Sequence, residues 1–306
     1  MALSRRLRQQ TGRHALVDGI PFTLPVASAS SPALMAAFPI NAQRAAELFP
    51  GNELHPLCIW GHAILLVSVI DYRQTNIGKY IEYSLGIGCT HGPRPVSLLR
   101  AMLFRKSCGL GQYVFDLPVS TEISVKGGKG IWGMPKHQAN LDFQITDSSV
   151  RSRYDLDGAM VAEVEIERPR RASFPMSTSA INWCAFRGML MKSSIFFQGK
   201  MGFRLWRKGS ARLTLGPHPR ADALRRLEIG ERPLFTGYFP ESSGVLDDHL
   251  ESWFLSYAEP PTHASEGMQS VVDLGLGETW LPQPGSPEAA AAARDASPRP
   301  SAGSGA

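Results

Sequence analysis

The stretch Gly128-Lys129-Gly130-Ile131-Trp132-Gly133-Met134-Pro135-Lys136-His137 combines glycines, apolar side chains and a lysine that follows proline. Glycine adopts backbone conformations that other residues avoid, so Gly127–Gly130 predicts a tight turn that lets the Pro-Lys segment approach a cavity. The apolar neighbours Ile131 and Trp132 are of the kind that disfavours a charged amine. Taken alone, a lysine after proline usually lies in a surface turn, because motifs this short have low specificity.

A second motif, Gly78-Lys79-Tyr80-Ile81-Glu82, lies upstream in a predicted strand. Alternate residues of a strand share a face, so Tyr80 and Glu82 would line the same cavity. A glutamate in a strand most often faces solvent, and only its place in this pattern suggests a function. Together the two motifs resemble those of the acetoacetate decarboxylase family. The resemblance extends over residues 38–258.

The resemblance implies both a fold and a site. The fold would be α+β and mainly antiparallel β, a barrel or sheet domain with few helices. Lys136 falls on the family's Schiff-base lysine, and Glu82 falls on the glutamate that faces the reactive amine. The expected substrate-binding residues are Tyr80, Trp132, Met134 and His137. No metal or organic cofactor is required by this chemistry, and the family's members suggest a homo-oligomer.

The motifs also depart from the family pattern. Decarboxylases of the family carry a second lysine directly after the reactive one, where this chain has His137. An arginine and an acidic residue of the family are replaced around Ser31 and Leu65, and a glutamate is replaced at Gly130. The interval between the motifs is longer than in the decarboxylase, which implies an insertion near residues 91–109. These differences leave the substrate open.

The chemistry of a Schiff-base lysine sets a requirement on its surroundings. An amine attacks a ketone only when neutral, whereas lysine in water is almost entirely ammonium at pH 7. The protonated imine is then an electron sink. The sequence therefore predicts a carbon-carbon lyase that forms an imine through Lys136 with a β-keto acid or related keto compound and releases CO2. The alternatives are a Schiff-base aldolase or dehydratase, or a non-catalytic pocket that binds an apolar keto ligand.

Strands predominate in the predicted secondary structure. Asn41 is a good N-cap for a short helix through Leu48. Short segments rich in β-branched or aromatic residues, separated by turn formers, predict strands at residues 63–70, 78–88, 113–117, 140–146, 151–156, 160–167, 186–197, 203–206, 212–215 and 234–239. Without regular crossover helices, these strands favour an antiparallel α+β or barrel-like fold.

The sequence also predicts how the chain is divided. Residues 1–32 mix basic, small and proline residues and are expected to form a flexible arm, residues 33–260 form the domain, and residues 261–306 are a low-complexity tail without structure. The longest apolar run, residues 63–70, falls far short of the roughly 20 residues of a membrane helix. No membrane partner and a cytoplasmic location are therefore expected.

Charge and cysteine usage argue against two other classes of site. The formal net charge of +5 is a mild excess, and the basic residues are not interleaved with aromatic residues on one face, so no nucleic-acid partner is expected. The four cysteines contain no C-x-x-C pair. Cys89 and His91 could ligate a metal, but a competent site needs three or four ligands. The expected partner is a small keto acid or related ligand.

Overall fold

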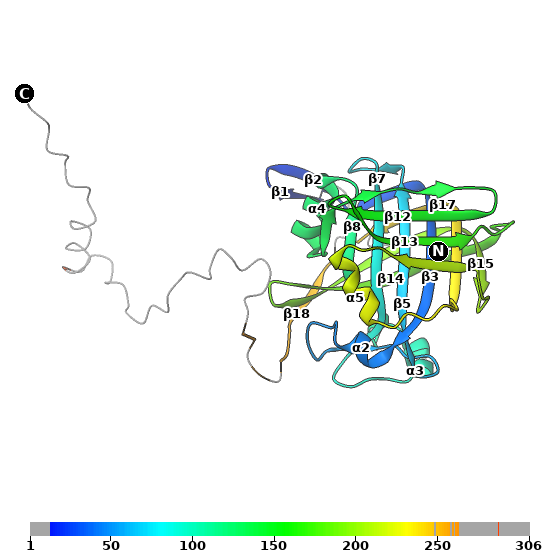
Figure 1. Ribbon diagram of the computed structural model, residues 1–306. Coiled ribbons are helices and arrows are strands. Elements are labelled where there is room, and N and C mark those ends of the chain that lie inside the picture. Colours follow the sequence, from blue (N-terminus) through cyan, green and yellow to red (C-terminus); the bar gives the residue numbers. More distant parts are fainter. Residues whose placement is uncertain (1–12, 248, 258, 260, 263–286, 288–306) are drawn as a thin grey trace, which may run out of the picture. The chain divides into compact units, whose positions relative to one another are not determined.

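Seven strands of the computed structural model close into a barrel (Figure 1). Around the barrel each strand pairs with the next, and the last pairs with the first, in the order β7, β5, β3, β17, β15, β14, β8. Every pairing is antiparallel except that of β8 with β14. The strands are β3 (Val26–Asn41), β5 (His62–Tyr72), β7 (Tyr80–His91), β8 (Gly111–Val119), β14 (Phe174–Phe186), β15 (Met189–Leu205) and β17 (Phe235–Leu246).

Shorter elements surround the barrel. Four strands extend its sheet: β4 (Leu54–Pro56), β6 (Gln74–Thr75), β9 (Lys136–Gln138) and β18 (Glu251–Phe254). A separate hairpin joins β1 (Arg13–Val17) and β2 (Ile20–Leu24). A second sheet contains β10 (Asn140–Leu141), β11 (Gln144–Ile145), β12 (Ser149–Leu156), β13 (Ala159–Glu167) and β16 (Ala211–Leu215). The α-helices between residues 13 and 247 are α2 (Ala42–Ala46), α3 (Leu98–Leu103), α4 (Glu122–Trp132) and α5 (Asp222–Arg226).

The structure describes residues 13–247, 249–257, 259, 261–262 and 287. The chain divides into two units, residues 1–266 and 267–306, and all the elements named above belong to the first. Nearly all of the predicted tail, residues 261–306, lies outside the described residues. The fold is α+β and mainly antiparallel β, which confirms the predicted class.

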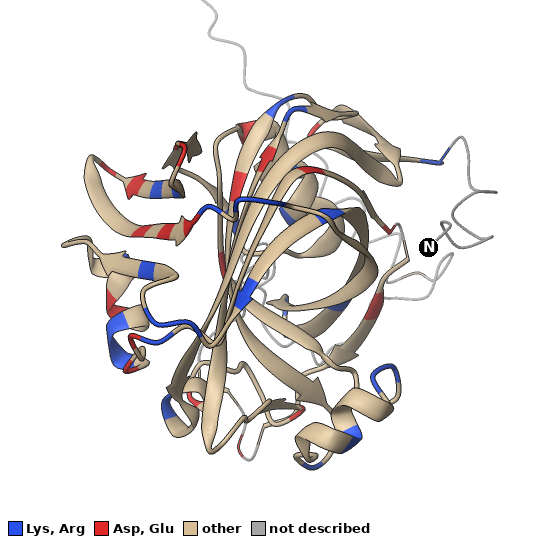
Figure 2. Ribbon diagram, turned by 90° about the vertical axis from the view of Figure 1, so that its right-hand side faces the viewer, with Lys and Arg blue, Asp and Glu red and all other residues tan. Residues whose placement is uncertain are grey.

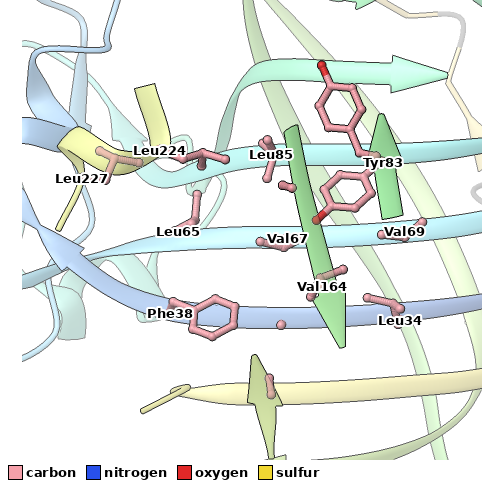
Figure 3. Close-up of a cluster of buried hydrophobic side chains, with 14 of the residues drawn as sticks. Leu34, Phe38, Leu65, Val67, Val69, Tyr83, Leu85, Val164, Leu224 and Leu227 are labelled. Atoms are coloured by element: carbon pink, nitrogen blue, oxygen red, sulfur yellow. The ribbon is translucent and has the colours of Figure 1, made fainter. Parts of the chain in front are cut away.

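Strand alternation separates the two faces of the barrel wall. On β5, Leu65, Val67 and Val69 are fully buried and point outward, where they meet the second sheet (Figure 3). Val164 of β13 and Leu224 of α5 cover the same cluster. Burying one such side chain contributes about 1.5–3 kcal/mol. The residues between them on β5 point into the barrel, and this interior holds the candidate site.

Residues 13–32 are not the loose arm that the sequence predicts. They form the β1–β2 hairpin and the first part of β3, which pairs with β17 through Ser28 and Gly244. Phe22 is 2% exposed and packs against Gly127. The pairing of β3 with β17 is irregular here, with register shifts on both sides of Ser242 and a positive φ of 49° at Ser30, so this segment shows no regular strand period.

The predicted strand at residues 186–197 runs across a hairpin turn. β14 ends at Phe186 and β15 begins at Met189, and these residues pair across the two-residue turn Arg187-Gly188. Both turn residues have positive φ, 53° and 72°. This is the backbone of a type I′ turn, for which Asn-Gly and Asp-Gly are the usual sequence signals. Arg-Gly is a weaker turn signal, so the sequence did not reveal the hairpin. The predicted N-cap at Asn41 is confirmed, since its side chain accepts from the amides of Gln43 and Arg44.

The glycines before Trp132 lie in helix α4, and the predicted tight turn is wrong. The helix ends at Gly133, whose φ of 65° is the left-handed conformation that closes many helices. The earlier glycines serve close packing. A Cβ atom on Gly127 would lie 2.7 Å from the Phe22 ring, and one on Gly128 would lie 2.6 Å from Lys136 Cε. The glycines therefore let the hairpin and the lysine side chain lie directly against the helix.

Candidate active site

Lys136 and Glu82 form a close pair inside the barrel. Lys136 Nζ lies 2.7 Å from Glu82 Oε2 and donates a 3.0 Å hydrogen bond to Ser124 Oγ. Nζ also lies 5.3 Å from the centroid of the Tyr80 ring. Lys136 is 5% exposed and Ser124 is fully buried. The amine is thus shielded from water and held by a carboxylate and a hydroxyl.

Three elements bring these groups together. Lys136 opens β9, which pairs in parallel with the end of β8 through Leu117. Glu82 lies on β7 and points into the barrel. Its neighbour Tyr83 points out of the barrel, into the hydrophobic cluster under the second sheet (Figure 3). Ser124 lies in the first turns of α4, which packs directly on β9. The Pro-Lys motif therefore links the helix to the barrel.

Two tyrosines flank the glutamate. The Tyr72 hydroxyl donates to Glu82 Oε1 at 3.5 Å, and the Tyr72 and Tyr80 rings stack with centroids 4.6 Å apart. Burial, and then the charge of Glu82, raises the pKa of both hydroxyls well above the ordinary value. Both side chains therefore remain neutral phenols, which can donate hydrogen bonds to Glu82 or to a bound ligand.

The pair faces a cavity of about 140 Å³. Because one water molecule needs about 10–15 Å³ of cavity volume, the cavity has room for roughly ten water-sized groups. Its wall includes Tyr80, Glu82, Met134 and Lys136 among the residues predicted from the sequence. Cys184 also lines it, but burial raises the pKa of this thiol to about 12, so it is not a competing nucleophile at neutral pH.

Two residues predicted to bind substrate, Trp132 and His137, do not line this cavity. Trp132 is 2% exposed, packs in an apolar cluster and donates from Nε1 to the Asp247 carbonyl at 2.8 Å. His137 follows Lys136 in a strand, so its side chain points to the opposite face. That face carries the second sheet, where His137 meets Tyr154. The family's second lysine is thus replaced by a residue directed away from the amine.

His137 belongs to a partly buried polar network behind the barrel wall. Its Nε2 lies 2.9 Å from the Tyr154 hydroxyl, and its Nδ1 lies 3.3 Å from an Arg220 guanidinium nitrogen. Arg220 also donates to Asp116 at 2.8 Å. Burial lowers the pKa of His137, with Asp116 opposing and Arg220 reinforcing the shift. Since Arg220 can only donate, Nδ1 of neutral His137 accepts and Nε2 carries the proton.

The network predicts a pH dependence of stability. The folded state binds the His137 proton more weakly than the unfolded state. The stability that neutral His137 contributes is therefore complete above the unfolded pKa of about 6.5, and it is lost as the pH falls from there through the lower folded pKa. Urea unfolding at pH 7, 6 and 5 should show falling stability, with a smaller fall in His137→Gln. Burial also lowers the pKa of His91, so part of the dependence of stability on pH should remain in His137→Gln. Equal slopes in the two proteins would contradict this role for His137.

Gly128 provides a test of how closely the lysine is positioned. Gly128→Ala places a Cβ atom against Lys136 Cδ and Cε, so the amine must move away from Glu82 and Ser124. Helix propensity gains about 1 kcal/mol from the same change, which offsets part of the strain. We expect a folded protein in which imine formation, measured by reductive trapping with a keto acid, is about 100-fold slower.

Gly130→Ala is the matched control for Gly128→Ala. A Cβ atom on Gly130 would lie 2.7 Å from Val17 Cγ1, on the β1–β2 hairpin and not on the lysine. This variant should form the imine at the unmodified rate. Equal rates in the two glycine variants would show that contact with α4 does not position Lys136.

A comparison with protein families decides the identification. The model described as acetoacetate decarboxylase (ADC) matches residues 9–248. The chain belongs to the acetoacetate decarboxylase family. The match begins before residue 13, so strands β1 and β2 lie within the family region. None of the curated proteins matches the chain.

Solved structures share the acetoacetate decarboxylase fold at low identity. Acetoacetate decarboxylase from Legionella pneumophila is 12% identical, with 81% of this chain and 90% of that chain covered and a TM-score of 0.55. A second acetoacetate decarboxylase structure is 12% identical, with 82% and 98% covered and a TM-score of 0.56. The enduracididine biosynthesis enzyme MppR is 14% identical, with 77% and 89% covered and a TM-score of 0.54. These likenesses show the barrel fold.

Cys89 and His91 pack against apolar and aromatic side chains. Cys89 is buried in an apolar cluster, and the His91 ring stacks on Trp183 with centroids 4.6 Å apart. Within the described residues, no three His, Cys, Asp or Glu side chains are grouped to hold a metal ion.

On the face shown in Figure 2, basic and acidic residues are interspersed. None of the helices in the described part of the chain is long and apolar enough to cross a membrane.

Sequence reasoning missed Ser124, Tyr72 and the amides Gln112 and Asn182, which line or border the cavity. Tyr72 lies two positions after Ile70, which ends the predicted strand at residues 63–70, so only the longer strand β5 of the structure places it on the inward face. Ser124 had no signal in the sequence, since it reaches the amine only because α4 folds back on β9. The amides depend on the parallel pairing of β8 with β14, which no local pattern reveals.

Proposed function

We propose that this protein is a decarboxylase of β-keto acids that works through an imine on Lys136. One observation carries the proposal: in a chain of the acetoacetate decarboxylase family, the buried Lys136 amine lies 2.7 Å from Glu82 at a largely apolar cavity. An amine attacks a ketone only in its neutral form, so the lysine must first give up a proton. Glu82 is within reach to accept that proton.

The reaction follows from these positions. The amine attacks the ketone carbon, water leaves with the carbonyl oxygen, and a protonated imine remains. Loss of CO2 from a β-keto acid then sends the bonding electron pair into the imine as an enamine. The enamine carbon that lost CO2 then takes up a proton, which restores the imine. Hydrolysis of this imine releases the ketone and the free lysine. Glu82 is placed to move protons at the nitrogen, and Ser124 to orient it.

The cavity wall favours decarboxylation over aldol chemistry. Among the described residues that line it, Lys136 is the only cationic side chain, and Val114, Leu117 and Met134 supply an apolar surface. A carboxylate there is poorly solvated, while CO2 is neutral, so the environment favours its loss. MppR, with the same fold, has been solved with pyruvate and with a condensation product of pyruvate. Aldol or dehydration chemistry is therefore the second candidate.

Release of labelled CO2 separates the two candidates. The protein is incubated with acetoacetate, longer β-keto acids and pyruvate, and both the gas and the borohydride-reduced adduct are measured. The proposal predicts CO2 from the β-keto acids at a rate above that in buffer. An adduct without CO2 would replace it by aldolase or dehydratase chemistry. A folded protein that bound keto compounds but formed no adduct would be a non-catalytic ligand-binding pocket.

A further inference from the structure

Two amide side chains meet on the inner wall of the barrel. Gln112 of β8 and Asn182 of β14 are register partners across the parallel pairing of these strands. Gln112 Nε2 donates to Asn182 Oδ1 at 2.9 Å, and both side chains line the cavity that contains Lys136. A Cβ atom on Gly86 would lie 2.8 Å from Gln112 Oε1, so glycine at this position leaves room for the amide.

The amide pair retains hydrogen-bonding capacity. One amide donates to the other, which leaves one NH2 group and one carbonyl for a ligand whichever way the two groups are turned. In the described part of the chain, no further side-chain hydrogen bond is found for either residue. Such groups at a cavity wall bind a ligand or water, since a polar group removed from water without a partner destabilises the folded state.

The amides lie far from the reactive end of the cavity. Lys136 pairs with Leu117, and Gln112 is five residues earlier on the same strand. At about 3.3 Å per residue, the backbone positions are roughly 16 Å apart. The wall between them is apolar, with Val114 and Leu117 on β8 and Cys184 on β14. A molecule of the size of acetoacetate bound at Lys136 would leave the amide end unfilled.

We propose that Gln112 and Asn182 form a second recognition site for the far end of the substrate. This inference rests on the proposed function and names its substrate class: a keto compound that carries a neutral hydroxyl or carboxamide beyond an apolar spacer. Such a group both donates and accepts, as the amide pair does. A charged end group fits less well, because neither the amides nor the apolar wall neutralises it.

The unmodified protein tests this first. The two probes are an eight-carbon β-keto acid with a terminal hydroxyl and its methyl-ended parent. We expect kcat/KM to be at least about tenfold higher for the hydroxyl probe, since a site built to hydrogen-bond a hydroxyl discriminates against an analogue that lacks it. Equal values, or a preference for the methyl end, would overturn the inference.

Variants then locate the site. Asn182→Leu and, in a separate protein, Gln112→Met should each remove most of the preference for the hydroxyl probe, measured as the ratio of kcat/KM for the two probes. The control is Gln198→Leu, an exposed amide on β15 outside this cavity, which should retain the preference. A preference unchanged in both amide variants would place recognition of the hydroxyl elsewhere.

Binding distinguishes this inference from the proposed function. Calorimetry with the matching seven-carbon methyl ketones, which carry no carboxylate, measures the amide site even if no imine forms. If the hydroxyl-ended ketone bound more tightly than the methyl-ended one, and Asn182→Leu removed this difference, the amide site would be supported even if the protein released no CO2. Decarboxylation of both probes with equal affinity for both ketones would support the function and exclude the site.

Discussion

Lys136→Met and Lys136→Arg should each lower the rate of β-keto acid decarboxylation by about 10⁴-fold or more, the order expected when a covalent nucleophile is removed. Methionine has no nucleophilic nitrogen, and the arginine guanidinium remains protonated at neutral pH. Arginine preserves a positive charge opposite Glu82, whereas methionine leaves that carboxylate without its ion-pair partner. Loss of activity in both variants would therefore reflect the missing amine.

Folding must be measured with these variants. Removing one partner of a buried ion pair costs about 3–5 kcal/mol, so Lys136→Met is compared with the unmodified protein by circular dichroism and thermal unfolding. Lys126→Ala is the control for a general effect of losing a lysine near the site. Lys126 lies on the same helix as Ser124 but pairs with Asp18 and Glu122. Residual decarboxylation within tenfold of normal in folded Lys136→Arg would exclude the imine mechanism.

Glu82→Gln should slow turnover by about 100-fold or more, because glutamine has the same shape but cannot accept a proton from the Lys136 amine. The amide can still accept the hydrogen bond from the Tyr72 hydroxyl, so the local structure is kept. We expect kcat to fall more than KM changes, as measured by steady-state kinetics of CO2 release.

Glu122→Gln is the matched control for Glu82→Gln. Glu122 begins α4, pairs with Lys126 at 3.4 Å and has a largely exposed side chain. The same chemical change at this position should leave kcat unaltered. If Glu82→Gln also kept its full rate, Glu82 would have no part in proton transfer.

The central pair could be predicted from the sequence because each motif is local. The resemblance of its motif to that of the family marks Lys136, because a lysine after proline has low specificity by itself, and strand alternation places Tyr80 and Glu82 on one face. The mainly antiparallel fold followed from the many short strands. Strand β9, which the sequence did not predict, places Lys136 and His137 on opposite faces and so directs His137 away from the cavity.

Other parts of the site depend on long-range closure. Gln112 and Asn182 are 70 residues apart in the chain and meet only because β8 pairs in parallel with β14. The glycines of α4 were interpreted by their backbone freedom, whereas their role in the structure is to admit Lys136, Phe22 and Val17. Packing against distant segments leaves no pattern in a short stretch of sequence.

Reductive trapping detects the Lys136 imine itself. The protein is incubated with acetoacetate or a longer β-keto acid, reduced with borohydride, digested and analysed by mass spectrometry. We expect one modified peptide, with the added mass on Lys136, in the unmodified protein and in the Lys126→Ala and Lys129→Ala variants. An adduct on another lysine, or none with any keto acid in a folded protein, would contradict the imine mechanism.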